Sequence, residues 1–195
     1  MLAADTGKRA MLIAVILVVF PFCMVHAAIS DTLSMTISNR VTLLLIATFA
    51  IVAPLAGLGW TDYGMHFAAG ALVLAVTFSL FAMGTMGGGD AKLLAATAVW
   101  MGWSFELVQY LVYSSFVGGI LTVAILFYRR SALSVYTGSN PLLRNFADHS
   151  AAVPYGIALG IAGLLIYPET PLMQWAVDQL SGSGAASLGA ILYKL

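Results

Sequence analysis

Charge is the property that this sequence has least of. Only 8% of its 195 residues are charged, whereas a soluble domain has about 25%. So few charged side chains cannot cover the surface of a water-soluble globule of this size, and 61% of the residues are hydrophobic. The composition therefore excludes a soluble domain and predicts an integral membrane protein whose surroundings are the lipid bilayer.

Cysteine and grouped basic residues are also scarce. Cys23 is the one cysteine and lies in an apolar run, which excludes a disulfide framework and a cysteine zinc cluster. Three scattered histidines do not form a zinc site. The net charge is zero and the basic residues are dispersed, which argues against nucleic acid as a partner. We expect neither a metal nor an organic cofactor.

Long apolar segments predict membrane spans, because a hydrocarbon core of about 30 Å needs roughly 20 apolar residues per helix. The predicted fold is an all-α polytopic membrane protein with about six transmembrane helices, in a single domain over residues 1–195. The expected spans cover 11–29, 41–59, 66–82, 91–103, 105–128 and 152–167. Outside them lie an N-terminal tail (1–10), a cytoplasmic loop (129–151) and a C-terminal tail (172–195). The C-terminal tail contains a Ser/Gly-rich break and either lies at the interface or turns back into the membrane.

The first apolar segment has a second interpretation. Lys8 and Arg9, the apolar run and the small residue Ala27 resemble a secretory signal peptide that includes 11–27, and residues 28 onward would then be the mature protein. The apolar run is longer than the hydrophobic region of most signal peptides, which favours a membrane span.

The distribution of Lys and Arg predicts the orientation of the spans, because cytoplasmic loops carry an excess of both. The loops after spans one, three and five hold Arg40, Lys92, Arg129, Arg130 and Arg144, and the opposite side holds Lys8, Arg9 and Lys194. This places the odd-numbered loops in the cytoplasm. Asp31 and Asp90 then lie on the same, cytoplasmic side.

The stretch 84-GTMGGGDAKLLAATAVWMG-102 places a carboxylate directly before an apolar helix. At about 1.5 Å per residue, segment 91–103 is roughly 20 Å long, too short to cross from one surface to the other. Asp90 therefore lies partly inside the low-dielectric zone, where an ionisable group indicates function by default.

The glycines before Asp90 allow two interpretations. Gly87, Gly88 and Gly89 have no Cβ, so an extended substrate backbone could lie beside them. Alternatively, Gly84 and Gly88 have the spacing of a helix-packing surface in lipid. Both interpretations remain open on the sequence.

Asp31 begins the stretch 31-DTLSMTISNRVTLLL-45 and could meet Asp90. Two carboxylates a few ångströms apart cannot readily both ionise, so one keeps a proton. The charged carboxylate can activate water while the protonated one donates to a carbonyl, which is the chemistry of an aspartic peptidase. A proton relay in a small transporter is the alternative.

Three motifs resemble prepilin peptidases, the aspartic intramembrane enzymes that process type IV pilin precursors. The stretch GGGDAKLLAA closely resembles their GxGD signature. Asp31 followed by 37-ISNRVTLL-44 is similar to their first-aspartate motif, with Asn39 in the Asn position and Ser38 where proline is usual. The segment 153-VPYGIALGIAG-163 is similar to their PYG segment.

The resemblance implies a catalytic pair, Asp31 and Asp90, with motif residues Gly87, Gly88, Gly89, Lys92 and Asn39 near the substrate. It implies cleavage of a short basic leader from a pilin precursor at the cytoplasmic face of the bacterial inner membrane, with pilus-assembly proteins as further partners. The chain lacks the four-cysteine loop of long members and looks like the short form associated with tight-adherence (Flp) pili. A pilus-assembly scaffold with a decayed site stays open because of Ser38.

Overall fold

The computed structural model describes residues 2–137, 140, 143–148 and 152–192. The helices are α1 (Leu2–Ser34), α2 (Asn39–Leu55), α3 (Trp60–Ala82), α4 (Gly88–Met101), α5 (Phe105–Arg130), α6 (Leu133–Thr137), α7 (Arg144–Ala147), α8 (Gly156–Ile166), the 3-10 helix η1 (Tyr167–Glu169) and α9 (Pro171–Leu192). The described part of the chain contains no strand. The all-α class predicted from the sequence is confirmed.

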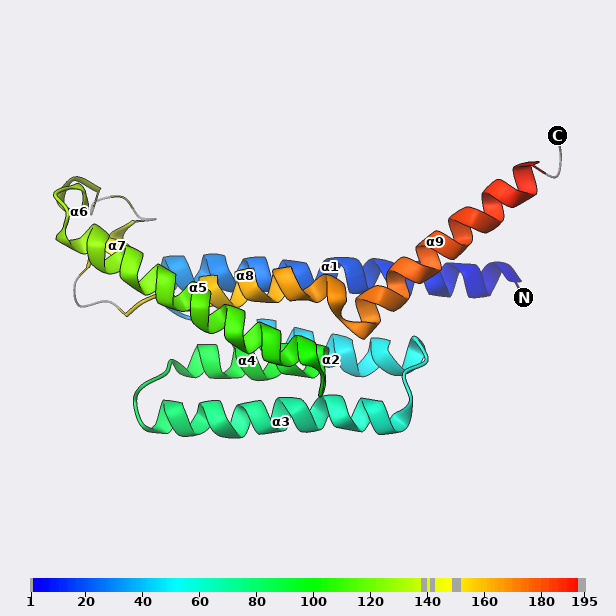
Figure 1. The fold of residues 1–195 in the computed structure, drawn as a ribbon, viewed down its shortest axis with the longest axis horizontal. Coiled ribbons are helices and arrows are strands. Elements are labelled where there is room, and N and C mark those ends of the chain that lie inside the picture. Colours follow the sequence, from blue (N-terminus) through cyan, green and yellow to red (C-terminus); the bar gives the residue numbers. More distant parts are fainter. Residues whose placement is uncertain (1, 138–139, 141–142, 149–151, 193–195) are drawn as a thin grey trace.

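The long helices form an elongated bundle and run roughly along its long axis (Figure 1). The helices α1 and α8 pack against each other, α3 lies on the opposite side, and α2 and α4 lie between these layers. Helix α5 crosses the bundle obliquely and packs chiefly on α8. One end of the bundle therefore gathers the last turns of α1, α3 and α5 and the first turns of α2, α4 and α8.

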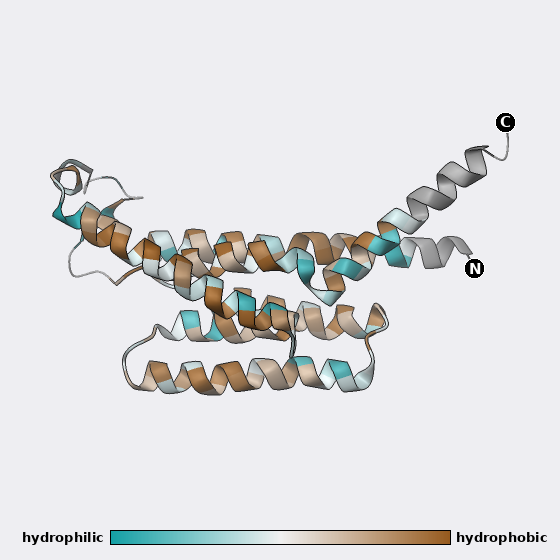
Figure 2. Cartoon of the chain, viewed as in Figure 1, coloured by the Kyte–Doolittle hydropathy of each residue, from teal (hydrophilic) through white to brown (hydrophobic). Residues whose placement is uncertain are grey.

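Within the part of the chain that the structure describes, three helical segments are long and apolar enough to cross a membrane: Gly7–Ser34, Trp60–Ala82 and Phe105–Arg130. The pair Gly156–Glu169 and Pro171–Gly182, bent by 49°, makes a fourth if it counts as one span. Hydrophobic residues predominate along α3 and α5 (Figure 2). A polytopic membrane protein is thus confirmed. The expected six spans all fall on helices, but α2 has 17 residues and α4 only 14.

Helix α4 is the buried centre of the bundle. All of its residues from Ala91 to Met101 are buried except Lys92. A helix that is hydrophobic all round must be covered on every side, and α4 packs on α2, α3 and α8. Its Trp100 is fully buried, with the ring of Phe20 at a centroid distance of 5.2 Å and that of Phe49 at 5.7 Å.

The two ends of the chain differ from the expectation of simple tails. Residues 2–10 belong to α1, so the N-terminal tail continues the first helix. The expected Ser/Gly-rich break in the C-terminal tail is wrong, because α9 runs without interruption from Pro171 to Leu192. The chain bends instead between η1 and α9, beside Pro168 and Pro171. Proline lacks a backbone N–H, which explains why the bend lies there.

Candidate active site

The two aspartates lie at the same end of the bundle. Asp31 stands three residues before the end of α1, and Asp90 is in the first turn of α4. Asp31 is buried and Asp90 is half-buried. Asp31 lies close enough to Asp90 for its negative charge to act on that carboxyl group. The tertiary fold thus brings together two acidic groups from distant parts of the sequence.

A backbone amide of α8 holds the carboxylate of Asp31. The N–H of Gly156 donates a hydrogen bond of 2.7 Å to Oδ2 of Asp31. A Cβ built on Gly156 would lie 2.7 Å from Cβ of Asp31, which no side chain could tolerate without displacement. Glycine is therefore required at this position for helix α8 to reach the carboxylate. The N-terminal end of a helix also carries a partial positive charge that favours an anion.

The start of α4 holds the carboxylate of Asp90 close to its own backbone. Gly87 is the N-cap residue of α4, and a Cβ on it would lie 2.8 Å from Oδ2 of Asp90. The absence of a side chain at Gly87 therefore leaves the space that this carboxylate occupies. An acidic group in the first turn of a helix is stabilised by the exposed N–H groups there.

The remaining glycines of this stretch contact other parts of the same chain. A Cβ on Gly89 would lie 3.2 Å from Cβ of Ile37, in the turn between α1 and α2. A Cβ on Gly88 would lie 3.1 Å from the ring of Phe81. Gly84 has open space around it and a φ of +73°, so it serves the turn before α4. Packing therefore accounts for Gly88 and Gly89, while the approach of a substrate backbone stays a prediction.

Two further motif residues meet at the edge of the site. The Nζ of Lys92 donates a hydrogen bond of 3.0 Å to Oδ1 of Asn39, and both side chains are exposed. This bond joins the first turn of α4 to the first turn of α2. Ser38, which stands where the resembling family has proline, is the N-cap of α2, and its hydroxyl accepts from the N–H of Arg40 at 3.3 Å. Ser38 thus supplies a helix cap at this turn.

Helix α1 ends three residues after Asp31, and a side chain from the distant helix α7 helps to fix that end. Met35 adopts a left-handed φ of 52°, and its N–H donates to the carbonyl of Asp31 at 2.8 Å. The Nδ2 of Asn145 donates to the carbonyls of Thr32 and Leu33 at 2.8 and 3.1 Å. The last carbonyls of a helix have no partner within it, so Asn145 holds the turn that carries Asp31.

Arg129 in turn fixes the loop that carries Asn145. Its guanidinium is buried and donates through Nε to the carbonyl of Phe146 at 3.0 Å and through Nη2 to that of Ala152 at 3.5 Å. The sequence indicated only a loop charge at this position. No sequence signal could have identified Gly156, Asn145 and Arg129 as supports of the site, although the PYG resemblance did point to the segment around Gly156.

Three hydroxyl side chains of α4 and α5 are buried in the bundle. Tyr110 is fully buried, with Thr97 and Ser114 beside its hydroxyl. Among the described residues no three His, Cys, Asp or Glu side chains gather closely enough to hold a metal ion. His66 lies away from this site, where its Nδ1 is 2.8 Å from the carbonyl oxygen of Val99.

Comparison with known proteins gives one match. A sequence model described as the type IV leader peptidase family matches residues 18–123, just over half of the chain. The matched region includes Asp31, Asn39, Asp90 and Lys92 and ends before α8. No curated protein and no solved structure is significantly similar to the chain.

Proposed function

This chain belongs to the type IV leader peptidase family, and from that premise we propose that it is an aspartic endopeptidase whose catalytic pair is Asp31 and Asp90. Family membership gives a leader peptidase of type IV pilin precursors in general. The observation that carries the aspartic assignment is the position of the two carboxyl groups at one end of the bundle, where Asp31 is buried near the end of α1 and Asp90 is half-buried at the start of α4. Both residues lie within the part of the chain that the family model matches, Asp31 in α1 and Asp90 in α4.

The proposed reaction begins with Asp31 ionised and Asp90 protonated. The hydrogen bond from Gly156 favours the charged form of Asp31, and two neighbouring carboxylates cannot readily both ionise. Asp31 takes a proton from water, the water oxygen bonds to the scissile carbonyl carbon, and Asp90 gives its proton to the carbonyl oxygen. The resulting diol collapses as the C–N bond breaks. Asp31 then returns its proton to the leaving amine, and Asp90 takes one back from the diol.

The proposed site faces the cytoplasm from the inner membrane. Three basic residues of the predicted cytoplasmic loops, Arg40, Lys92 and Arg130, belong to the helix ends that surround the site. An excess of Lys and Arg is typical of cytoplasmic loops. A basic leader would thus be cleaved where it emerges from the membrane on that side.

The proposed substrate is a short pilin precursor of the tight-adherence (Flp) type, with a basic leader before its apolar helix. The absence of a four-cysteine insertion from the sequence supports the short form of the family. Pilus-assembly proteins are the further partners we propose. A proton-coupled transporter and a scaffold with a decayed site are the alternatives, and neither of them requires that a precursor be shortened.

Co-expression with such a precursor tests the assignment. We expect the wild-type chain to shorten the precursor on a gel, and Asp31→Asn and Asp90→Asn each to abolish the shortening. Asp62→Asn is the matched control, because Asp62 is an exposed aspartate in the first turn of α3 at the other end of the bundle. Unchanged processing of the precursor by either Asp31→Asn or Asp90→Asn would contradict the proposed catalytic pair. Failure of the wild type to shorten any precursor would favour the non-enzymatic alternatives.

A further inference from the structure

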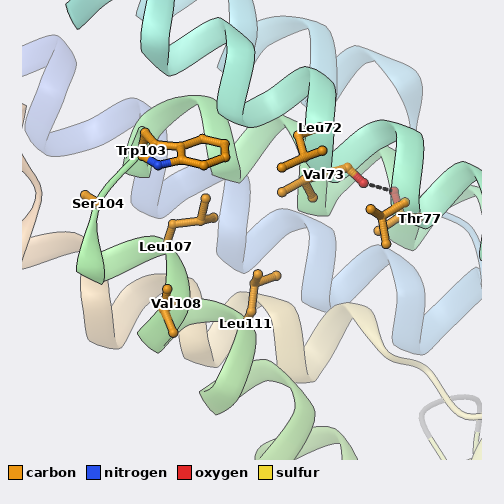
Figure 3. Close-up of a pocket in the computed structure, with 9 residues that line it drawn as sticks. Leu72, Val73, Thr77, Trp103, Ser104, Leu107, Val108 and Leu111 are labelled. Atoms are coloured by element: carbon orange, nitrogen blue, oxygen red, sulfur yellow. Dashed lines mark hydrogen bonds between the residues drawn. The ribbon is translucent and has the colours of Figure 1, made fainter.

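An apolar groove lies between α3 and α5 on the outside of the bundle (Figure 3). It has a volume of about 350 Å³. One wall comes from α3 and the other from α5 and the residues just before it; the lining includes Leu72, Val76, Thr77, Trp103, Val108 and Leu111. None of the described residues that line it is charged. An occupant of this groove would therefore be a hydrocarbon chain or an apolar helix.

The groove exists because its two walls pack on different partners. Helix α3 packs extensively on α4, whereas α5 packs chiefly on α8 and slants away from α3 (Figure 1). Its walls consequently keep large apolar side chains half exposed: Leu72 is 50% exposed, Val76 55% and Val108 53%. These side chains are available to a helix that approaches from the membrane.

The α3 wall of the groove leads to the candidate active site. On α3, the hydroxyl of Thr77 donates to the carbonyl of Ala91 at 3.4 Å, and Ala91 directly follows Asp90. On α5, the lining residue Leu111 directly follows Tyr110, which is fully buried. The opposite end of the groove lies at Trp103, beyond the last turn of α4. The groove therefore extends from the middle of the bundle towards the catalytic end.

We propose that this groove binds the apolar helix of the leader-bearing precursor and guides its first turn to Asp90. This inference rests on the proposed function. The α3 wall spans about 8 Å between Leu72 and Thr77, or roughly one and a half helical turns at 1.5 Å per residue. Two walls of branched side chains suit the helix-in-groove mode, in which side chains at i, i+3 and i+4 dock together. A lipid chain could fill the same volume, but the Thr77 end of the groove is hydrogen-bonded to Ala91, the residue after Asp90, where the helix of a substrate would have to end.

The position of the groove also indicates which peptide bond of the precursor would be cleaved. A helix seated between α3 and α5 has its cytoplasmic end beside Thr77 and Leu111, so the residues that precede this helix meet the start of α4. Peptide bonds inside a helix are hydrogen-bonded and enclosed by side chains, so the bond before the helix is the accessible one. The groove would thus select the junction between leader and apolar helix.

Site-specific photo-cross-linking tests this surface. A photoreactive amino acid replaces Leu72, in the groove, or Leu74, its matched control. Leu74 is also a half-exposed leucine of α3 (42%) but lies outside the groove, about 200° around the helix at 3.6 residues per turn. Both proteins also carry Asp90→Asn, so that the precursor stays uncut. The probe is a synthetic precursor with a basic leader ending in glycine and an apolar helix of roughly 20 residues, in phosphatidylethanolamine–phosphatidylglycerol vesicles.

We expect at least tenfold more precursor cross-linked at position 72 than at position 74, and competition by unlabelled precursor. Equal yields at the two positions, or lipid as the sole adduct at 72, would overturn the groove proposal. Wild-type protein in the same vesicles reports separately on the proposed function. Cleavage together with equal cross-linking would contradict the groove proposal and support the peptidase proposal. Selective cross-linking without cleavage would support the groove as a helix-binding surface and contradict the peptidase proposal.

Discussion

Two helix starts at opposite ends of the bundle share one local pattern. Helix α3 begins with 59-GWTD-62 and α4 with 87-GGGD-90, and in each the glycine is the N-cap and the aspartate lies in the first turn. A Cβ on the glycine would lie 3.4 Å from Oδ2 of Asp62 in one and 2.8 Å from Oδ2 of Asp90 in the other. Locally, therefore, the two aspartates have the same setting.

Their tertiary neighbours distinguish these aspartates. Asp62 is exposed, and the nearby group on which its charge acts is His66, one turn along its own helix. Asp90 is half-buried and is acted on by a second carboxylate from another helix. A glycine and an aspartate thus occur at both helix starts, and the catalytic role proposed for Asp90 depends on its partner from α1.

The largest difference between the two ends should appear on neutralising each aspartate. Asp90→Asn removes a group that transfers a proton, and general acid–base catalysis contributes about 10²- to 10⁴-fold, so we expect at least that loss in the rate of precursor cleavage. Asp62→Asn should change the rate less than about twofold, because an exposed charge has little effect at a distance. Rates measured in one vesicle preparation make the comparison. A similar loss in both variants would mean that the local pattern alone matters.

Replacing a glycine by alanine should have a large effect at the catalytic end of the bundle and little effect at the opposite end. Gly156→Ala places a Cβ 2.7 Å from that of Asp31 and 2.9 Å from its Oδ2, so the carboxylate must move. We expect cleavage to fall about 10²-fold, as misplacement of a reacting group by about 1 Å does. Gly64→Ala is the control, because nothing lies within 4 Å of its Cβ position in α3. Thermal unfolding of both variants separates a displaced carboxylate from an unfolded protein, and equal activity would contradict the role of Gly156.

Filling the groove with a larger side chain should have an intermediate effect on cleavage. Leu72→Trp fills part of it and should raise KM for the precursor about tenfold, which corresponds to about 1.4 kcal/mol of binding. Leu74→Trp adds the same bulk on a face outside the groove and should leave KM unchanged. Initial rates over a range of precursor concentrations distinguish KM from kcat. A fall in kcat with unchanged KM for Leu72→Trp would indicate distortion of α3 instead of lost binding.

The smallest effect should come from exposed hydrogen bonds at the two ends. Asn39→Ala removes the 3.0 Å bond from Lys92 that joins α2 to α4. Exposed polar pairs contribute up to about 1 kcal/mol, so cleavage should fall less than about fivefold. Gln179→Ala removes an exposed acceptor, 3.3 Å from Arg9 at the far end, and should have no effect on cleavage. Loss of all activity in Asn39→Ala would instead indicate contact with the substrate.

The sequence predicted the class of fold and the position of Asp31 and Asp90 on one common side, because both depend on one-dimensional signals. Apolar segment length gives the helices, and the count of Lys and Arg in the loops predicts the cytoplasm as that side, which stays a prediction. The short 14-residue α4 was also foreseeable from the apolar segment after Asp90. The catalytic roles of Asp31 and Asp90 stay predictions that the substitutions above test.

What the sequence could not reveal depends on how helices are placed relative to one another. The contribution of Gly156 is a backbone N–H, which every residue except proline carries, so no residue type announces it. The roles of Asn145 and Arg129 arise from bonds to main-chain carbonyls of distant segments. The groove depends on the slant of α5 away from α3, which no pattern in either helix encodes alone.

The bond from Gly156 to Asp31 also has a consequence for how the protein is made. It joins residues 125 positions apart, and α8 is synthesised after both aspartates have left the ribosome. Until α8 is inserted, Asp31 lacks the amide that holds its carboxylate, so the proposed dyad is incomplete in the nascent chain. The proposed peptidase activity would then appear late in the insertion of the chain into the membrane. A nascent chain that had already placed α1 and α4 in the bilayer would not yet cleave neighbouring precursors.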